Sequence, residues 1–357
     1  MLGARGTRIA ELAALARELR PQLVAVEDAE AGERLRPLLT AGVELLLGTG
    51  ALERAATHSG VDRVVAAMVG AAGVAPVATA LAAGKGVALA NKEALVVAGR
   101  LLTALAEKSG AAILPIDSEH VALHQALRAG RAEEVERLIL TASGGPFLDR
   151  DPATFDAVAK DEALRHPTWS MGEKITIDSA TLINKGLELI EARWLFGVPP
   201  ERIAVVVHPR SIVHSMVEWQ DGSLVAQLAP NDMIFPIQYA LAYPERWPNR
   251  FARLAPEKLG TLDFRPLDET KFPAVSLARQ ALASGDSATA VLNAANEIAV
   301  GAFLSGRIRF SEIVATVAAV LDRHSAASVA TVEEALEWDR RGRQEAERVI
   351  GIESRSR

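Results

Sequence analysis

Short apolar runs alternate with amphipathic stretches over the first 117 residues, and this alternation constrains the fold more than any other feature of the chain. Runs of four to eight apolar residues between helical patterns are typical of parallel strands covered by helices. We therefore predict an α/β domain over residues 1–117, with ligands bound beyond the carboxyl ends of its strands. The predicted strands are 23–27, 43–48, 63–70, 86–90 and 112–116.

The pattern changes after residue 117, which indicates further domains. We predict a central α+β domain over 118–242, a linker rich in Pro and Arg over 243–268, and a helical domain over 269–357. The QDGS segment at 220–223 predicts a hairpin turn between two antiparallel strands. The predicted strands of the central domain are 137–142, 202–208, 211–219 and 223–229.

Composition excludes several kinds of site. The chain has no cysteine, which excludes disulfides, thiolate metal sites and cysteine nucleophiles. Its net charge is −6 and it carries no basic block, so neither nucleic acid nor an anionic membrane is an expected partner. The weakly polar run 64–84 is rich in Ala and Gly and contains Pro76, which favours strand, turn and helix over a membrane span. Residues 1–21 read as a charged amphipathic helix without a secretory signal, and we expect a cytoplasmic protein.

The segment PIDSEH at 115–120 follows a predicted strand and carries two carboxylates. Asp117 and Glu119 would point the same way in an extended chain and would suit Mg²⁺ or Mn²⁺. The alternative is a polar turn in which Asp117 or Ser118 caps the next helix. His120 and His124 share a helical face, but HVALH lacks the glutamate of a zinc-protease helix.

Two loops carry residues that suit a ligand. Ser143, Gly144 and Gly145 end a predicted strand, where small residues let backbone N–H groups approach an anion. A tight turn without a ligand is the alternative. The loop 165–174 combines His166, Trp169, Met171 and Gly172, and these side chains would either close over a ligand or pack on the core.

Residues 175–194 scan as an amphipathic helix. Its apolar stripe is flanked by a polar sector that contains Asn184, Lys185, Glu188 and Glu191. Lys185 and Glu188 stand three residues apart, so the sector could be a solvated face with a weak ion pair. Ser179 could cap this helix. No structural requirement explains Asn184, Lys185 and Gly186 near the start of the helix.

Several long segments resemble the 1-deoxy-D-xylulose 5-phosphate reductoisomerase family over nearly the whole chain. This resemblance implies a Rossmann-like first domain that binds NADPH, a central domain for catalysis and dimerisation, and a homodimer. It also implies a divalent metal, Mg²⁺, Mn²⁺ or Co²⁺, and a role in the non-mevalonate route to isoprenoids. The matching segments are VGAAG, ANKEALV, PIDSEH, TASGGPF, HPTWSMGEKITIDSATLINKGLELIEARWLF, HPRSIVHSMVEWQDGS and LNAANEIAV.

The resemblance assigns roles at the matching positions. Asp117, Glu119 and Glu188 would ligate the metal, which acts as a Lewis acid. Lys92 would contact the substrate, as would Ser118 beside the metal. The residues implied for the substrate phosphate are Ser143, Ser179, Asn184 and Lys185. Those implied elsewhere on the substrate are His166, which is also a candidate catalytic residue, and Trp169. Those implied for NADPH are Gly3, Arg5, Asn91, Glu93 and Gly172.

The sequence departs from the family at its beginning. A first strand and a GSTGSIG-type loop, which would bind the cofactor pyrophosphate, do not precede MLGARGTRIAEL. We expect a start codon assigned too late, and a real truncation is the alternative. Two other functions stay open: a plain NAD(P)-dependent dehydrogenase, and a non-catalytic protein that binds sugar phosphate and metal.

Overall fold

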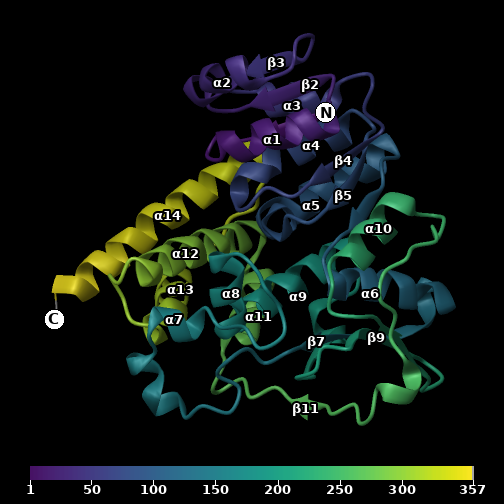
Figure 1. Ribbon diagram of the computed structural model, residues 1–357. Coiled ribbons are helices and arrows are strands. Elements are labelled where there is room, and N and C mark those ends of the chain that lie inside the picture. Colours follow the sequence, from purple (N-terminus) through teal and green to yellow (C-terminus); the bar gives the residue numbers. More distant parts are fainter. Residues whose placement is uncertain (356–357) are drawn as a thin grey trace. The chain divides into compact units, whose positions relative to one another are not determined.

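A computed structural model describes residues 1–355 of the chain, and it divides them into two compact units (Figure 1). The first unit consists of Met1–Asn91 and Leu102–Leu114, and the second of Lys92–Leu101 and Pro115 onwards. The helix α5 (Lys92–Ser109) runs across the boundary and is kinked at Ala98.

The first unit contains parallel strands covered by helices. One sheet has the order β1-β2-β3 and the other β4-β5-β6, with β1–β2, β2–β3 and β4–β5 parallel. All four residues of β2 are buried, as expected for a parallel strand covered on both faces. Its strands are β1 (Leu2–Ala4), β2 (Leu23–Val26), β3 (Glu44–Leu47), β4 (Arg63–Ala66), β5 (Gly86–Leu89) and β6 (Ile113–Pro115), of which the last residue, Pro115, is assigned to the second unit. Its other helices are α1 (Ile9–Leu19), α2 (Ala29–Leu35), α3 (Ala51–Thr57) and α4 (Val74–Ala82).

The five predicted strands of this region are confirmed, whereas their arrangement was not predictable. The strands lie in two three-stranded sheets rather than in one. A further strand, β1, pairs with β2 through Leu2–Ala4, within a segment that we had predicted to be helical. Strand pairing joins residues far apart in the chain, so an apolar pattern locates strands without showing which of them are neighbours.

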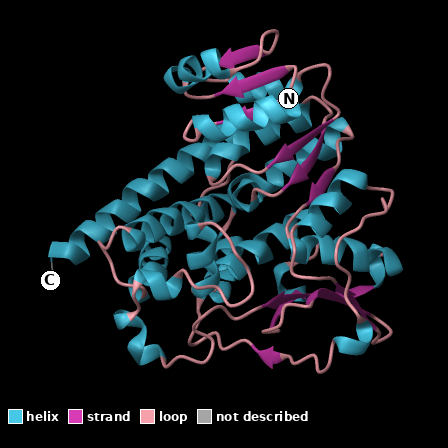
Figure 2. Ribbon diagram, viewed as in Figure 1, coloured by secondary structure: helices cyan, strands magenta, loops and turns pink. Residues whose placement is uncertain are grey.

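The second unit is built on a mixed sheet of order β10-β9-β7-β8-β11, visible among the magenta strands of Figure 2. The predicted hairpin joins β9 to β10, and β7 pairs antiparallel with β9 and parallel with β8. Its strands are β7 (Val135–Ala142), β8 (Ile203–Val207), β9 (Val213–Trp219), β10 (Leu224–Leu228) and β11 (Arg265–Pro266). The helices in this part of the chain are α6 (Ser118–Ala126), α7 (Lys160–Ala163), α8 (Glu173–Ala180), α9 (Ile183–Phe196) and α10 (Ile234–Ala242).

The last part of the chain is helical, as predicted. The helix α12 packs against α13 and α14, and the three lie together in Figure 1. By length and composition α12 could cross a membrane, but most of it is buried inside the protein, as in the core helix of a soluble domain. The four helices are α11 (Ala274–Ser284), α12 (Asp286–Leu304), α13 (Ser311–Arg323) and α14 (Val332–Arg355).

The predicted helix over 175–194 is wrong in one respect, because it is two helices. Leu182 adopts a left-handed backbone conformation with φ 58°, which ends α8 and starts α9 in a new direction. Ser179 therefore lies inside α8 and is not a cap of the following helix. Gly186 has a structural need after all: a Cβ atom there would lie 2.9 Å from the carbonyl oxygen of Ala274 on α11. The absence of a side chain lets α9 and α11 approach closely.

Candidate active site

Three carboxylates from two helices meet in the second unit. Asp117 occupies the N-cap position of α6, Glu119 lies in the first turn of that helix, and Glu188 lies in the middle of α9. Each offers one oxygen atom, and these oxygens lie within 4.8 Å of one another. Asp117 makes no capping hydrogen bond through its side chain, so the capping alternative does not account for it. Convergent carboxylate oxygens are ligands that Mg²⁺ and Mn²⁺ accept.

Two buried lysines neutralise part of this charge. The Nζ atom of Lys92 lies 2.6 Å from Oδ2 of Asp117 and 3.8 Å from Oε1 of Glu188. Lys185 pairs with Glu188 and lies 3.1 Å from Oε1 of Glu119. Burial alone would lower the pKa of each ammonium group, but the carboxylates outweigh it and raise the pKa of both. The alternative of a solvated face around Lys185 and Glu188 does not hold, because both side chains are buried.

Glu188 provides a test of whether the cluster suits a cation. Its side chain is 1% exposed, and burial together with repulsion from Glu119 raises its pKa to about 7. A divalent cation between the carboxylates would remove this repulsion and supply the missing positive charge. The residues present therefore fit a divalent metal.

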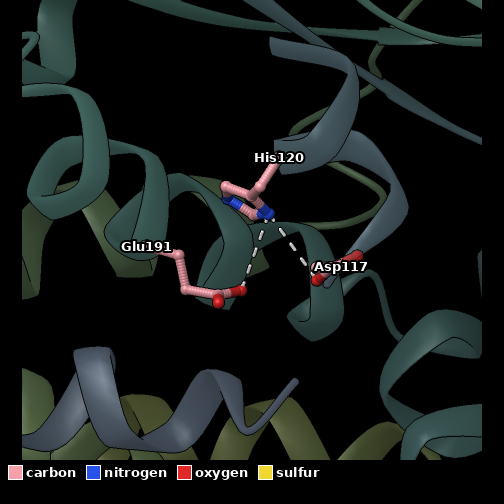
Figure 3. Close-up of side chains that lie close together, drawn as sticks. All are labelled: Asp117, His120 and Glu191. Atoms are coloured by element: carbon pink, nitrogen blue, oxygen red, sulfur yellow. Dashed lines mark ion pairs between the residues drawn. The ribbon is translucent and has the colours of Figure 1, made fainter. Parts of the chain in front are cut away.

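A second group, shown in Figure 3, adjoins the first and was not predicted. The Nδ1 atom of His120 lies 3.7 Å from Oδ2 of Asp117 and 3.9 Å from Oε2 of Glu191. Its Nε2 atom lies 2.9 Å from the main-chain oxygen of Glu188, to which it donates. Burial disfavours the imidazolium, but Glu191 and Asp117 outweigh it and raise the pKa of His120 to about 9. Burial also raises the pKa of Glu191 to about 8. One feature of the sequence could have indicated this group: Glu191 follows Glu188 by three residues, so the two side chains are neighbours on the helix.

A hydroxyl cluster forms the second half of the site. The Nε2 atom of His166 lies 3.2 Å from the Oγ atom of Ser143 and 3.0 Å from that of Ser179. Burial lowers the pKa of His166, which favours the neutral imidazole. A glycine is needed at position 145, since its φ is 66° and a Cβ atom there would lie 2.7 Å from the main-chain oxygen of Ser179. Two hydroxyls and an imidazole thus converge from a strand end, a loop and a helix.

Further predicted substrate residues lie beside these two groups. Asn184 donates its side-chain N–H to Glu188, and Ser118 donates its hydroxyl to Oε2 of Glu119 at 2.8 Å. The ring of Trp169 is tilted against that of His214, with centroids 6.4 Å apart. A cavity of about 450 Å³ is lined in part by Ser118 and His214. These contacts are compatible with the predicted roles of Ser118, Trp169 and Asn184, which stay predictions.

The predicted cofactor residues are divided between the two units. Gly3, Arg5 and Asn91 belong to the first, whereas Glu93 and Gly172 belong to the second. Asn91 donates its side-chain N–H to the main-chain oxygen of Gly70 at 3.0 Å, which holds the VGAAG turn. Arg5 is exposed and lies 3.5 Å from Glu27. Gly172 is the N-cap of α8. Their contact with NADPH also stays a prediction.

Three family models match the chain. The model of 1-deoxy-D-xylulose 5-phosphate reductoisomerase matches residues 2–99. A model of the C-terminal domain of that enzyme matches residues 113–196, and another C-terminal model of DXP reductoisomerase matches 228–345.

Named relatives and solved structures of the same enzyme are also similar to this chain. The 1-deoxy-D-xylulose 5-phosphate reductoisomerase of Chlorobium phaeobacteroides is 50% identical over 97% of this chain and 91% of its own length. That of Anaeromyxobacter dehalogenans is 51% identical over 94% of this chain and 86% of its own. A crystal structure of DOX-P reductoisomerase with NADPH, fosmidomycin and magnesium has a TM-score of 0.92 and 42% identity, covering 97% of this chain and 90% of that one. The Zymomonas mobilis enzyme with NADPH has a TM-score of 0.91 and 39% identity, covering 98% and 91%. The chain belongs to the 1-deoxy-D-xylulose 5-phosphate reductoisomerase family.

Proposed function

We propose that this chain converts 1-deoxy-D-xylulose 5-phosphate to 2-C-methyl-D-erythritol 4-phosphate, with NADPH as reductant and a divalent metal. One observation carries the proposal beyond family membership. Carboxylate oxygens of Glu188, Asp117 and Glu119 lie within 4.8 Å of one another. Lys185 contacts both glutamates, and it lies on α9, the helix that follows the helix of Ser179. The proposed metal site and the proposed phosphate site would therefore share the segment formed by α8 and α9. A plain dehydrogenase would not need this combination.

Each half of the site has a distinct task in this reaction. When bound at Asp117, Glu119 and Glu188, the metal would chelate substrate oxygens and polarise them for rearrangement and reduction. Lys92, held 2.6 Å from Asp117, would present its ammonium group to the substrate beside these carboxylates. Trp169 would cover the carbon skeleton and exclude water from it.

The hydroxyl cluster would hold the phosphate. Ser143 and Ser179 supply hydroxyl donors, Asn184 an amide donor, and Lys185 a positive charge. His166 touches both serine hydroxyls, so its neutral ring would orient them toward the phosphate oxygens. Fixing the phosphate places the reacting end of a small sugar at a set distance, which is where binding energy aids catalysis.

NADPH is the proposed reductant because the relatives solved with a nucleotide contain it. Gly3 and Arg5 would meet the adenosine ribose and its 2′-phosphate, where an exposed guanidinium favours NADPH over NADH. Asn91, Glu93 and Gly172 would border the nicotinamide. The proposed location is the cytoplasm, in keeping with an apolar helix α12 that is buried inside the protein.

We also propose a homodimer formed by the central part of the chain. The helix α10 exposes Ile237 and Leu241 one turn apart, each with more than a third of its surface accessible, and Trp247 and Phe251 are exposed nearby in sequence. In addition, β10 is an edge strand of its sheet. Exposed apolar side chains and an open strand edge are features that a second copy would cover.

The test of the activity is an NADPH-oxidation assay with 1-deoxy-D-xylulose 5-phosphate and Mg²⁺ or Mn²⁺. We expect turnover that requires both the substrate phosphate and the cation. Glu188→Gln should abolish it and leave the circular dichroism spectrum unchanged. The control is Glu173→Gln, an exposed glutamate on α8 that should retain turnover. Turnover in the presence of a chelator, or near-normal activity of Glu188→Gln, would refute the proposal.

A further inference from the structure

A largely buried ammonium group, that of Lys174, lies between two carboxylates of different helices. The Nζ atom of Lys174, on the first turn of α8, lies 2.9 Å from Oε1 of Glu93 on α5 and 2.8 Å from Oδ2 of Asp178, one turn further along α8. The side chain of Lys174 is 18% exposed, whereas that of Asp178 is fully buried. The contact therefore ties the start of α5 to α8 in an environment that screens charges poorly.

The second oxygen of Asp178 is held from the helical part of the chain. Asn296 of α12 is fully buried, and its Nδ2 atom donates to Oδ1 of Asp178 at 2.8 Å. Each oxygen of this carboxylate thus has a separate partner, an ammonium on one side and an amide on the other. A buried carboxylate with both oxygens occupied has little freedom to rotate or shift.

Two members of this network are chain neighbours of proposed substrate residues, and one of them, Glu93, is itself proposed to border the nicotinamide. Glu93 follows Lys92, which pairs with Asp117, and Asp178 precedes Ser179, whose hydroxyl contacts His166. Successive side chains of a helix point about 100° apart, so Ser179 can face the substrate while Asp178 faces inward. The network is therefore placed to fix the backbone from which the site residues project.

We propose that Lys174 and Asn296 are positioning residues for the phosphate site, holding Ser179 in register with Ser143 and His166 through Asp178. This inference rests on the proposed function, because it takes the hydroxyl cluster to be the phosphate site. Neither side chain is expected to touch the substrate. A displacement of the Ser179 hydroxyl by a fraction of an ångström would weaken its bond to a phosphate oxygen.

The chain offers a matched pair of variants for the test. Asn293 lies one turn before Asn296 on the same helix, is equally buried, and donates to Glu297 at 2.9 Å in an ion network with Arg343 and Asp339. Asn296→Ala and Asn293→Ala should lower the melting temperature similarly. Only Asn296→Ala should weaken calorimetric binding of 1-deoxy-D-xylulose 5-phosphate with Mg²⁺, by about tenfold. In the NADPH-oxidation assay, the KM of Asn296→Ala for 1-deoxy-D-xylulose 5-phosphate should rise, whereas its kcat should change less. Unchanged affinity in Asn296→Ala, or an equal loss in Asn293→Ala, would overturn the inference.

Two further comparisons complete the design. Lys174→Arg keeps a charged donor and should retain affinity better than Lys174→Met, which gives a second reading if Asn296→Ala does not fold. Equal affinities of the two Lys174 variants would contradict a positioning role. Ser179→Ala tests the phosphate site itself. If Ser179→Ala binds the substrate normally, the proposed site is wrong, whereas a loss there with normal Asn296→Ala removes only the inference.

Discussion

The ammonium group of Lys92 lies 2.6 Å from the Oδ2 atom of Asp117, 25 residues away in the chain. The pair is almost inaccessible to solvent, with side-chain exposures of 11% and 12%. Burial by itself would raise the pKa of Asp117, but Lys92 and His120 together outweigh it and hold that pKa well below its ordinary value. The charged form of the proposed metal ligand is therefore maintained by two neighbouring side chains, Lys92 and His120.

Removing Lys92 should destabilise the protein unless a cation replaces its charge. Lys92→Met leaves Asp117 with the more distant His120, 3.7 Å away, as its remaining positive neighbour, and the loss of the closer ammonium costs about 3 kcal/mol. Mn²⁺ should restore part of this stability, since it binds the same carboxylate. Urea unfolding with and without Mn²⁺ measures both effects. Lys160→Met, at an exposed ion pair with Glu173, should change stability by less than about 0.5 kcal/mol. A Lys92→Met protein as stable as the parent would contradict this account.

Adding one methyl group at Gly186 should separate two helices. In Gly186→Ala the new Cβ atom would lie 2.9 Å from the oxygen of Ala274, so α9 and α11 must move apart. We expect a loss of about 2 kcal/mol, together with weaker metal binding because Glu188 lies on the displaced helix. Gly301→Ala on α12 is the control, because nothing lies within 4 Å of its Cβ position. That variant should be neutral or more stable by up to about 1 kcal/mol. Similar unfolding midpoints for both variants would argue against the close approach.

Acid should remove the stabilisation that Glu93 provides. Burial alone would raise the pKa of Glu93, but Lys174, together with a backbone hydrogen bond and Lys92, outweighs it and lowers that pKa below its ordinary 4.5. Since the folded state has the lower pKa, the stabilisation is complete above about pH 4.5 and is lost as the pH falls through the folded value. Glu93→Gln should therefore differ most from the parent near pH 7 and progressively less below pH 4.5. Urea midpoints at pH 7, 5 and 4 measure this difference, and a gap that widens toward acid would contradict it.

A charge on α10 should disrupt the proposed dimer. Leu241→Arg places a guanidinium on the exposed apolar face, and burying it against a second copy would be costly. We expect the mass from light scattering to fall from dimer to monomer. Leu15→Arg is the matched control, because Leu15 is an exposed leucine on α1, in the other unit. A monomeric parent protein, or dissociation caused equally by Leu15→Arg, would remove the support for this interface.

Most strand positions could be predicted from the sequence because each reflects a local pattern, whereas the short strands β1 and β11 were not predicted. The hairpin between β9 and β10 and the final helices were equally local predictions. Pattern reasoning failed at Leu182, where an apolar residue adopts the left-handed conformation that usually favours glycine. The conformational propensity of leucine does not predict a helix break at this position. The break is set by how α8 and α9 pack, so a single long helix was the natural reading.

The site residues were identified through the resemblance and not through their local pattern. Taken alone, the polar sector of residues 175–194 favoured a solvated face, and Glu191 had no role in it. The structure buries Lys185, Glu188 and Glu191 because α6 and α9 bring them against Asp117 and His120. A helical wheel gives the angle of each side chain about the helix axis. It contains no information on which other parts of the protein cover that face of the helix.

The sequence by itself therefore determined most strands and helices, the absence of thiol chemistry, and the motifs that mark the family. Tertiary structure decided which strands pair, where α8 ends, and which charges share a buried space. The physical reason is distance along the chain: periodicity acts over a few residues, whereas Asn296 meets Asp178 across 118 residues. Contacts of that span depend on the packing of all the helices between them.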